Sequence, residues 1–221
     1  YNSFDSKEII KNLEKYSIKF YKILNKIKKK GKSFIYSSFK EYAGIKSLVK
    51  VLEINGYKNY VYHGSGKKRF AIWSGDEDHY IKEEIREVYN RKDNLYGDKL
   101  KLILGSPSIK EGVSLKAVKS VHIIEPYWNL SRLEQVIGRA SRYCSHIDFE
   151  DEEDREVDVY IYLSISDRLE ESIDQYIKNL SDNKNKIIKD FEKAIKESSI
   201  DCSLNLTSTI NNSEEEINCD N

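Results

Sequence analysis

Apolar positions along the chain recur at two spacings, and the two spacings alternate from one segment to the next. Compact apolar runs, which are typical of buried strands, occupy residues 33–39, 59–63, 69–73, 101–106, 121–125 and 157–163. Longer stretches with helical spacing of apolar residues occupy residues 6–30, 45–55, 79–91, 131–143, 166–180 and 183–198. Strands that alternate with helices in this way predict an α/β fold with a mainly parallel central sheet and helices on both faces.

The same pattern divides the chain into four parts. Residues 1–31 are predicted to form a leading helix, residues 32–165 the α/β lobe, and residues 166–200 an extension of charged amphipathic helices. Residues 201–221 are polar and acidic, and we expect them to be disordered. The charged stretch 148–158 is predicted to be a surface loop.

Charge and composition limit the range of functions. Lysine plus arginine and aspartate plus glutamate both total 37, so the net charge is zero and any basic surface for nucleic acid must be local. No apolar run reaches membrane-spanning length, so we expect a soluble intracellular protein with no membrane partner. The cysteines (Cys144, Cys202 and Cys219) are widely spaced and form no C-x-x-C pair, so neither a disulfide framework nor a metal site is predicted.

The chain begins at Tyr1 and contains no methionine. A complete translation product begins with methionine, so we expect this chain to be a fragment of a longer protein. A site that is incomplete on this chain is then expected to be completed by another part of that protein.

Two lysine-containing strings resemble the phosphate-binding loop G-x-x-x-x-G-K-[ST] but fail its pattern. In KKKGKS (28–33), Lys26 stands where the first glycine belongs, and the string ends a helix and leads into a strand, the reverse of a phosphate-binding loop. In GSGKK (64–68), Val61 stands at the position of the first glycine. We interpret the first string as a helix-to-strand connection and the second as a hairpin or loop.

A third string, DEDH (76–79), matches an acidic Mg²⁺-binding box of the D-E-x-H kind and follows an apolar strand. Such a box needs a phosphate cradle on the same lobe, and Ser74 and Gly75 separate Asp76 from the strand. We therefore interpret it as a solvated turn that starts the next helix.

Two segments, in order, carry the strongest functional pattern. The first is GSPSIKEGVSL (105–115), a strand end followed by small and polar residues that include Gly112 and Ser114. Small side chains with free N–H and hydroxyl groups allow close approach to a phosphate backbone. Taken alone, however, this segment is better explained as an ordinary strand-to-helix turn.

The second segment is QVIGRASR, whose functional residues are Gln135, Gly138, Arg139 and Arg142. Residues three apart lie on one helix face, so both guanidinium groups are expected to converge on one anion. The planar donor fork of arginine suits the oxygens of a transferring phosphoryl group. Gly138 is expected to let neighbouring backbone approach the helix. The alternative is a surface arginine pair that balances the acidic loop at 148–154.

Together these segments resemble the C-terminal RecA-like lobe of superfamily 2 helicases and translocases. QVIGRASR is similar to the family's motif VI, Q-x-x-G-R-x-x-R, GSPSIKEGVSL resembles motif V, and KSFIYSSF (32–39) resembles motif IV. A narrower resemblance covers 111–146, 154–163 and 195–205. It is to the helicase-like ATPases of large cytoplasmic DNA viruses, which include the small subunit of the poxvirus early transcription factor and the poxvirus nucleoside triphosphate phosphohydrolase I.

The resemblance implies roles for single residues. The catalytic arginine fingers would be Arg139 and Arg142, and the nucleotide-binding residues would be Gln135, Gly138, Gly112 and Glu111. The residues that contact the nucleic-acid strand would be Ser106, Ser108, Tyr36 and Ser37. Two positions keep an open alternative, since Glu111 is nearly as well explained as an ordinary loop charge and Trp128 favours packing over base stacking or nucleotide contact.

The resemblance also implies cofactors and partners. ATP and Mg²⁺ would be held mainly by an N-terminal helicase lobe absent from this chain, so this fragment alone would be inactive. The partners would be a DNA or RNA strand, that N-terminal lobe, and RNA polymerase or transcription factor subunits, in the virion or host cytoplasm of a viral system. The alternatives are a non-catalytic docking module of a transcription complex and an unrelated α/β phosphate-binding domain. The intact pair Arg139 and Arg142 favours the ATP-hydrolysing motor lobe over the docking module, because a scaffold needs no convergent arginines.

Overall fold

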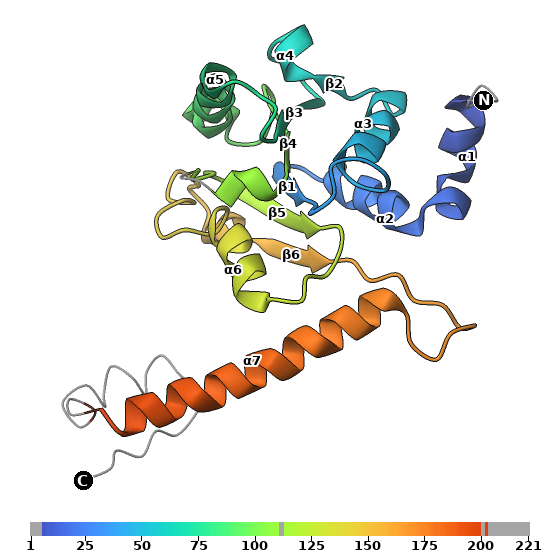
Figure 1. Cartoon of the computed structure of the whole chain (residues 1–221). Helices are drawn as coiled ribbons and strands as arrows, with labels where there is room; N and C mark the ends of the chain where they lie inside the picture. The colour runs from blue at the N-terminus through green and yellow to red at the C-terminus, as the bar shows by residue number, and fades with distance from the viewer. Residues whose placement is uncertain (1–5, 111–112, 200–201, 203–221) are drawn as a thin grey trace.

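The computed structural model describes residues 6–110, 113–199 and 202, and at its centre lies a sheet of six parallel strands (Figure 1). The strands are β1 (Lys32–Tyr36), β2 (Lys58–Asn59), β3 (Arg69–Trp73), β4 (Leu102–Gly105), β5 (Val118–Ile123) and β6 (Asp158–Ile161). Their order in the sheet is β2-β3-β4-β1-β5-β6, and every neighbouring pair is parallel. The predicted mainly parallel sheet is confirmed.

Helices fill the connections between the strands. The α-helices are α1 (Ser6–Tyr16), α2 (Ile18–Ile27), α3 (Ile45–Ile54), α4 (Tyr60–His63), α5 (His79–Asn90), α6 (Leu130–Gly138) and α7 (Ile173–Glu197). Short 3-10 helices are η1 (Lys92–Asn94), η2 (Pro107–Lys110) and η3 (Glu152–Arg155). The helices predicted at 45–55 and 79–91 are confirmed as α3 and α5.

Side chains alternate along the strands and divide between two hydrophobic cores, one on each face of the sheet. In β1, Phe34 and Tyr36 belong to the core that α5 and α6 cover, whereas Ile35 belongs to the core that α1, α2 and α3 cover. Successive strand residues point to opposite faces, so β1, which is buried along its whole length, supplies both cores. Figure 1 shows the two groups of helices on opposite sides of the sheet, which confirms the three-layer α/β class.

Residues 59–63 depart from the predicted strand pattern. The strand β2 stops at Asn59, and residues 60–63 form the short helix α4. The side chain of Asn59 accepts a hydrogen bond from the N–H of Val61 (3.0 Å) and caps this helix, which ends at Gly64. The prediction of a strand over 59–63 was therefore wrong, because the asparagine cap outweighs the strand preference of the apolar residues.

The leading segment has a kink at Asn12 within α1 and a break at Ser17. Residues 6–30, predicted as one helix, form α1 and α2 with Ser17 between them. The backbone of Ser17 is extended, and its hydroxyl accepts a hydrogen bond from the N–H of Phe20 (3.3 Å), so it caps the second helix.

At the C-terminal end, the structure has one helix where two were predicted. Two helices were predicted at 166–180 and 183–198, and the structure has the single helix α7. A reciprocal capping box between Ser172 and Gln175 fixes where it starts. The sequence from 173 to 197 contains neither glycine nor proline, so nothing in it ends the helix midway.

Membrane, metal and cysteine features complete the description. In the ranges described, no helix is both long and apolar enough to cross a membrane. Over the same ranges, no cluster of three or more His, Cys, Asp or Glu side chains is placed to hold a metal ion. Cys144 is free and exposed, whereas Cys202 is disulfide-bonded, which the cysteine spacing did not predict.

Lys32, the first residue of β1, is a buried amine. Its Nζ donates a hydrogen bond to the carbonyl of Tyr89 (2.7 Å) and lies 4.5 Å from the centroid of the Tyr89 ring. Burial lowers the pKa of Lys32 from 10.5 to about 7, because the ammonium group loses its hydration. Between these two values the unfolded chain holds a proton that the folded protein does not. The free energy of unfolding therefore falls as the pH decreases through this window.

Replacing Lys32 with methionine should remove this pH dependence. Methionine preserves the apolar stem, and the Asn94 side chain still donates to the carbonyl of Tyr89 (3.2 Å). We expect Lys32→Met to be more stable than the unmodified protein at about pH 7, with an advantage that shrinks towards about pH 9.5. Denaturant unfolding at several pH values measures this difference. A stability difference that stays constant with pH would show that Lys32 is not held neutral by burial.

Candidate functional site

The sheet has two distinct edges because its strands all run the same way. Residues that follow a strand lie at its carboxyl edge, and residues that precede a strand lie at its amino edge. The segment 106–117 joins the end of β4 to the start of β5, so it runs from the carboxyl edge back to the amino edge. Along the way η2 packs against α6, and Ile109 and Leu115 share a hydrophobic core with Leu133 of α6.

Ser106 and Ser108 lie where this segment leaves β4. Ser106 is buried, its N–H donates to the carbonyl of Trp73 (3.1 Å), and its hydroxyl lies 3.1 Å from that of Ser108. Ser108 is only half-buried. Ser108 therefore has the more accessible hydroxyl, and contact of either side chain with nucleic acid stays a prediction.

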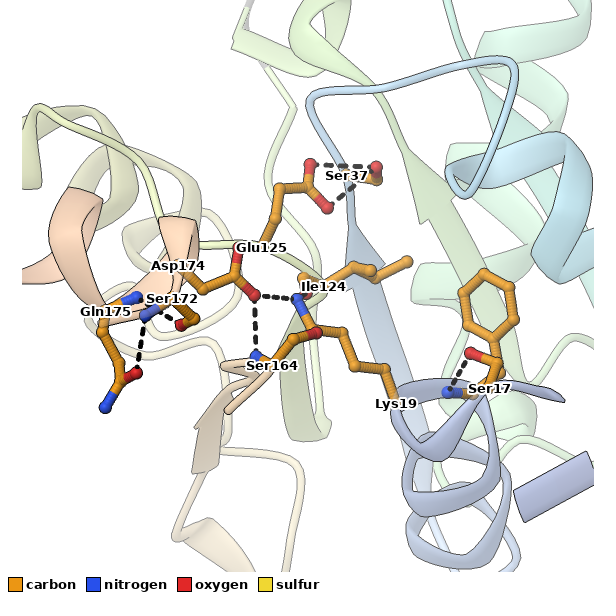
Figure 2. Close-up of polar contacts among 10 residues, drawn as sticks. Ser17, Lys19, Ser37, Ile124, Glu125, Ser164, Ser172, Asp174 and Gln175 are labelled. Carbon is orange, nitrogen blue, oxygen red and sulfur yellow. Dashed lines mark hydrogen bonds and ion pairs between the residues drawn. The ribbon is translucent and has the colours of Figure 1, made fainter. Parts of the chain in front are cut away.

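Tyr36 and Ser37 stand at the end of the neighbouring strand β1, and both are buried. The Tyr36 ring lies in the core under α5 and α6, and its hydroxyl has no hydrogen-bond partner in the described part of the chain. The Ser37 hydroxyl lies 3.0 and 3.1 Å from the two carboxylate oxygens of Glu125 (Figure 2), and the N–H of Ser38 donates to the same carboxylate. The structure thus turns both predicted side chains inward, away from solvent.

The loop that follows, residues 38–44, presents two aromatic rings that the sequence analysis missed. Phe39 is 59% exposed and Tyr42 is 93% exposed. The signal was two aromatic residues among polar ones between the end of a buried strand and Gly44. A loop at the surface offers such rings no core to enter, so their presence there is a functional hint.

A second polar cluster lies beside Glu125 at the end of β5. Lys19 of α2 donates to the carbonyl of Ile124 (3.0 Å) and forms an ion pair with Asp174 of α7 (2.5 Å). Asp174 also accepts from the N–H of Ser164 (2.7 Å), as Figure 2 shows. This strand end therefore holds the leading helices and the C-terminal helix next to Glu125.

The two arginines lie after α6 and not within it. The helix ends at Gly138, so Arg139 directly follows it and Arg142 lies further along the loop. The prediction that both arginines share one helix face was therefore wrong. Gln135 is exposed and lies four residues before Arg139, the spacing that aligns side chains over one turn.

Both arginines nevertheless border the C-terminal end of the segment 106–117, at the amino edge of the sheet. The N–H of Leu115 donates to the carbonyl of Arg139 (2.9 Å), and the guanidinium of Arg142 donates to the hydroxyl of Ser114. The side chain of Arg139 is half-buried and that of Arg142 is exposed. Their convergence on one anion stays a prediction, but both are tied to the same short stretch of backbone.

Asn90, the last residue of α5, fixes that stretch from the other side. Its side-chain Nδ2 donates to the backbone carbonyl of Ser114 (2.8 Å), and its side-chain Oδ1 accepts from the N–H of Lys116 (2.8 Å). The backbone beside the arginines is therefore held by two helix ends, that of α5 and that of α6.

The remaining predicted residues have different outcomes. A Cβ atom added to Gly138 would meet no described atom within 4 Å, so the expected close approach of backbone there was wrong. Gly112 and Glu111 lie outside the described residues. Trp128 is 48% exposed, and its ring centroid lies 4.6 Å from the Nζ of Lys184. Trp128 therefore packs at the surface and not in the core.

The three strings that resemble nucleotide-binding motifs have structural roles, as predicted. Residues 28–33 lead from α2 into β1, and residues 64–68 form the connection between α4 and β3. In the string 76–79, Asp78 occupies the N-cap position of α5, and the Glu77 carboxylate accepts from the N–H of Ser74 (2.6 Å).

The chain is similar to helicases of large DNA viruses. The model of the helicase conserved C-terminal domain matches residues 14–144. A protein of Acanthamoeba polyphaga mimivirus, provisionally named an ATP-dependent RNA helicase, is 50% identical over 100% of this chain and 39% of its own length. A provisionally named helicase of invertebrate iridescent virus 3 is 34% identical, over 90% of this chain and 21% of its own. This chain thus spans well under half the length of these relatives.

A third relative carries a different name. The termination factor NPH-I homolog of African swine fever virus is 27% identical to this chain. The match covers 62% of this chain and 21% of that protein.

Replacing Asn90 with alanine should loosen the backbone beside the arginines. Both side-chain hydrogen bonds are lost, so we expect the free energy of unfolding to fall by roughly 1–3 kcal/mol. Amide hydrogen exchange at Lys116 should become faster. Asn90→Asp still accepts from Lys116 but no longer donates to Ser114. Its free energy of unfolding should lie between those of Asn90→Ala and the unmodified protein. Unchanged stability and exchange in Asn90→Ala would show that other contacts hold this stretch.

Proposed function

Because the chain belongs to the family of helicase conserved C-terminal domains, we propose that it is the C-terminal motor lobe of an ATP-dependent helicase or translocase. The observation that carries the proposal is the segment 106–117, with hydroxyl side chains at one edge of the sheet and Arg139 and Arg142 at the other. A motor needs a link of this kind, because nucleotide chemistry at one place must change the grip on nucleic acid at another.

Arg139 and Arg142 are the groups that this lobe contributes to ATP hydrolysis. Guanidinium groups stay charged and present a planar fork of donors to phosphoryl oxygens. The surface fits an incoming phosphate chain, since Gln135 and Arg142 are exposed and no described atom crowds Gly138. ATP, with Mg²⁺ on an N-terminal lobe, supplies the phosphoryl bond whose hydrolysis drives the motor. The arginines stabilise the negative charge that develops on the phosphoryl oxygens.

The grip on nucleic acid lies at the carboxyl edge. Ser108 and the backbone around Ser106 offer hydroxyl and N–H donors to the phosphates of a DNA or RNA strand. Closure of the two lobes on ATP pulls the arginines towards the nucleotide. The packing of Ile109 and Leu115 against the apolar face of α6 transmits this movement to the strand.

We place the motor in viral transcription, with RNA polymerase or transcription factor subunits as partners. The name of the African swine fever virus relative, a termination factor homolog, supports this assignment. The compartment would then be the virion or the cytoplasm of the infected cell.

A second candidate function is a docking module without catalysis. The observation that favours it is the C-terminal half of α7, where Ile187, Phe191 and Ile195 are exposed. Apolar side chains on a solvent-facing helix are typical of protein contact surfaces. The two candidates differ in the role of the arginines, which only the motor requires.

Replacing Arg139 with alanine in the full-length protein separates the two candidates. We expect nucleic-acid-stimulated ATP turnover to fall by about a thousandfold or more, because the developing phosphoryl charge loses a stabilising guanidinium. ATP affinity should change little, since the other lobe holds most of the nucleotide. Steady-state turnover and equilibrium binding of a fluorescent ATP analogue measure the two quantities.

Arg168→Ala is the matched control, because Arg168 is exposed in the segment between β6 and α7. Its turnover should match that of the unmodified protein. Full turnover in Arg139→Ala would exclude the finger role. A full-length protein that binds transcription subunits but never hydrolyses ATP would favour the docking module.

A further inference from the structure

We propose that Phe39 and Tyr42 form a stacking platform for unpaired bases of a single-stranded nucleic acid. This inference rests on the proposed function and adds the class of substrate, a strand whose bases are free to stack. In this inference Phe39 and Tyr42 of the loop 38–44 contact the ligand in place of Tyr36 and Ser37, because those two side chains are buried.

The two rings stand on a rigid loop. Glu125 holds the beginning of the loop through the Ser37 hydroxyl and the N–H of Ser38, as Figure 2 shows for Ser37. Burial raises the pKa of Glu125, and the bonds from the two serines oppose this rise by favouring the charged form. The half-buried carboxylate is therefore an anchor that these hydrogen bonds fix in place.

The far end of the loop is equally fixed. The N–H of Ile45 donates to the carbonyl of Phe39 (3.0 Å), and the N–H of Lys46 donates to that of Lys40 (2.9 Å). A Cβ atom at Gly44 would lie 2.0 Å from the carbonyl oxygen of Phe39, so only glycine fits this turn. A loop fixed at both ends presents its rings with little entropy left to lose on binding.

The charges around the rings argue for contact with bases and not with phosphates. Lys40 pairs with Asp76 (2.7 Å), and Lys46 pairs with Glu41. Lys40 of the loop and Lys46 just after it are thus each paired with a carboxylate. The loop offers an aromatic surface. Any base can stack on it, so binding is expected to be independent of nucleotide sequence.

A groove beside Phe39 provides room for a base. Its volume is about 500 Å³, which falls in the range of small-ligand sites. Phe39 and Tyr16 line it together with Lys19 and Glu125. A base that stacks on Phe39 would therefore find polar groups in the lining of the groove, whereas the highly exposed Tyr42 is free to stack on a neighbouring base.

The position of the aromatic loop in the sheet agrees with the proposed contacts between Ser108, the backbone around Ser106 and the phosphates. The strands β1 and β4 are neighbours, and the N–H of Ser37 donates to the carbonyl of Gly105 (3.1 Å). The aromatic loop and the start of the segment 106–117 therefore leave the same edge of the sheet side by side. One strand of nucleic acid along this edge could meet both.

Binding to three labelled oligonucleotides of equal length tests the inference. These are a single strand, a strand with the same backbone but abasic sites, and a duplex, each titrated with the chain and followed by fluorescence anisotropy. We expect the abasic strand and the duplex to bind roughly tenfold or more weakly than the single strand, since one stacked base contributes about 1–3 kcal/mol.

Variants assign the effect to the two rings. Phe39→Ala and Tyr42→Ala should each weaken single-strand binding about tenfold or more and leave abasic-strand binding unchanged. Phe39→Tyr and Tyr42→Phe keep an aromatic face and should bind as the unmodified chain does. Tyr62→Ala is the matched control, because Tyr62 is 80% exposed but lies on α4, beyond the far strand of the sheet. Thermal unfolding confirms that each variant is folded.

The possible outcomes separate this inference from the proposed function. Equal binding of the single strand and the abasic strand overturns the stacking platform but leaves the phosphate grip intact. No binding to any oligonucleotide counts against the grip itself. Unchanged affinity in both alanine variants overturns the platform and assigns the rings to protein contact. Quenching of Trp128 fluorescence in that case would show bases stacking there instead, since Trp73, the other tryptophan, is buried.

Discussion

Parallel pairing of all six strands is the constraint on which the rest of the structure depends. It forces every connection to return along the length of the sheet, so chemical groups collect at two separate edges. The serine and aromatic side chains that follow β4 and β1 lie at the carboxyl edge, and Arg139 and Arg142 follow a helix that has returned to the amino edge. The topology thus places the proposed nucleic-acid contacts and the proposed nucleotide contacts at opposite edges of the sheet.

The segment 106–117 joins the edge of the proposed nucleic-acid contacts to the edge of the proposed nucleotide contacts. Its described residues Ile109 and Leu115 are buried with the apolar face of α6. In the proposed motor, a movement of α6 would therefore also displace Ile109 and Leu115. In the proposed motor, this shared packing would couple the two edges.

Much of this fold was predictable from sequence, and the failures have physical causes. Alternation placed the strands and the order of motifs placed the arginines, because both depend on local spacing. The end of α6 at Gly138 and the cap at Asn59 are decided by a few local hydrogen bonds, which periodicity does not detect. The burial of Tyr36 was not predicted because it depends on contacts far along the chain, as does the bond between Ser37 and Glu125.

The end of β5 illustrates how a buried ion pair can serve position more than stability. The side chains of Lys19 and Asp174 are only 16% and 17% exposed, so their desolvation offsets much of their attraction. The carbonyl of Ile124 and the N–H of Ser164 satisfy their remaining hydrogen-bonding capacity, which fixes one geometry. Glu125 follows Ile124 directly. The C-terminal helix and the aromatic loop are therefore both held by contacts at the end of β5. Any partner that shifts α7 would therefore act on the residue next to the anchor of that loop.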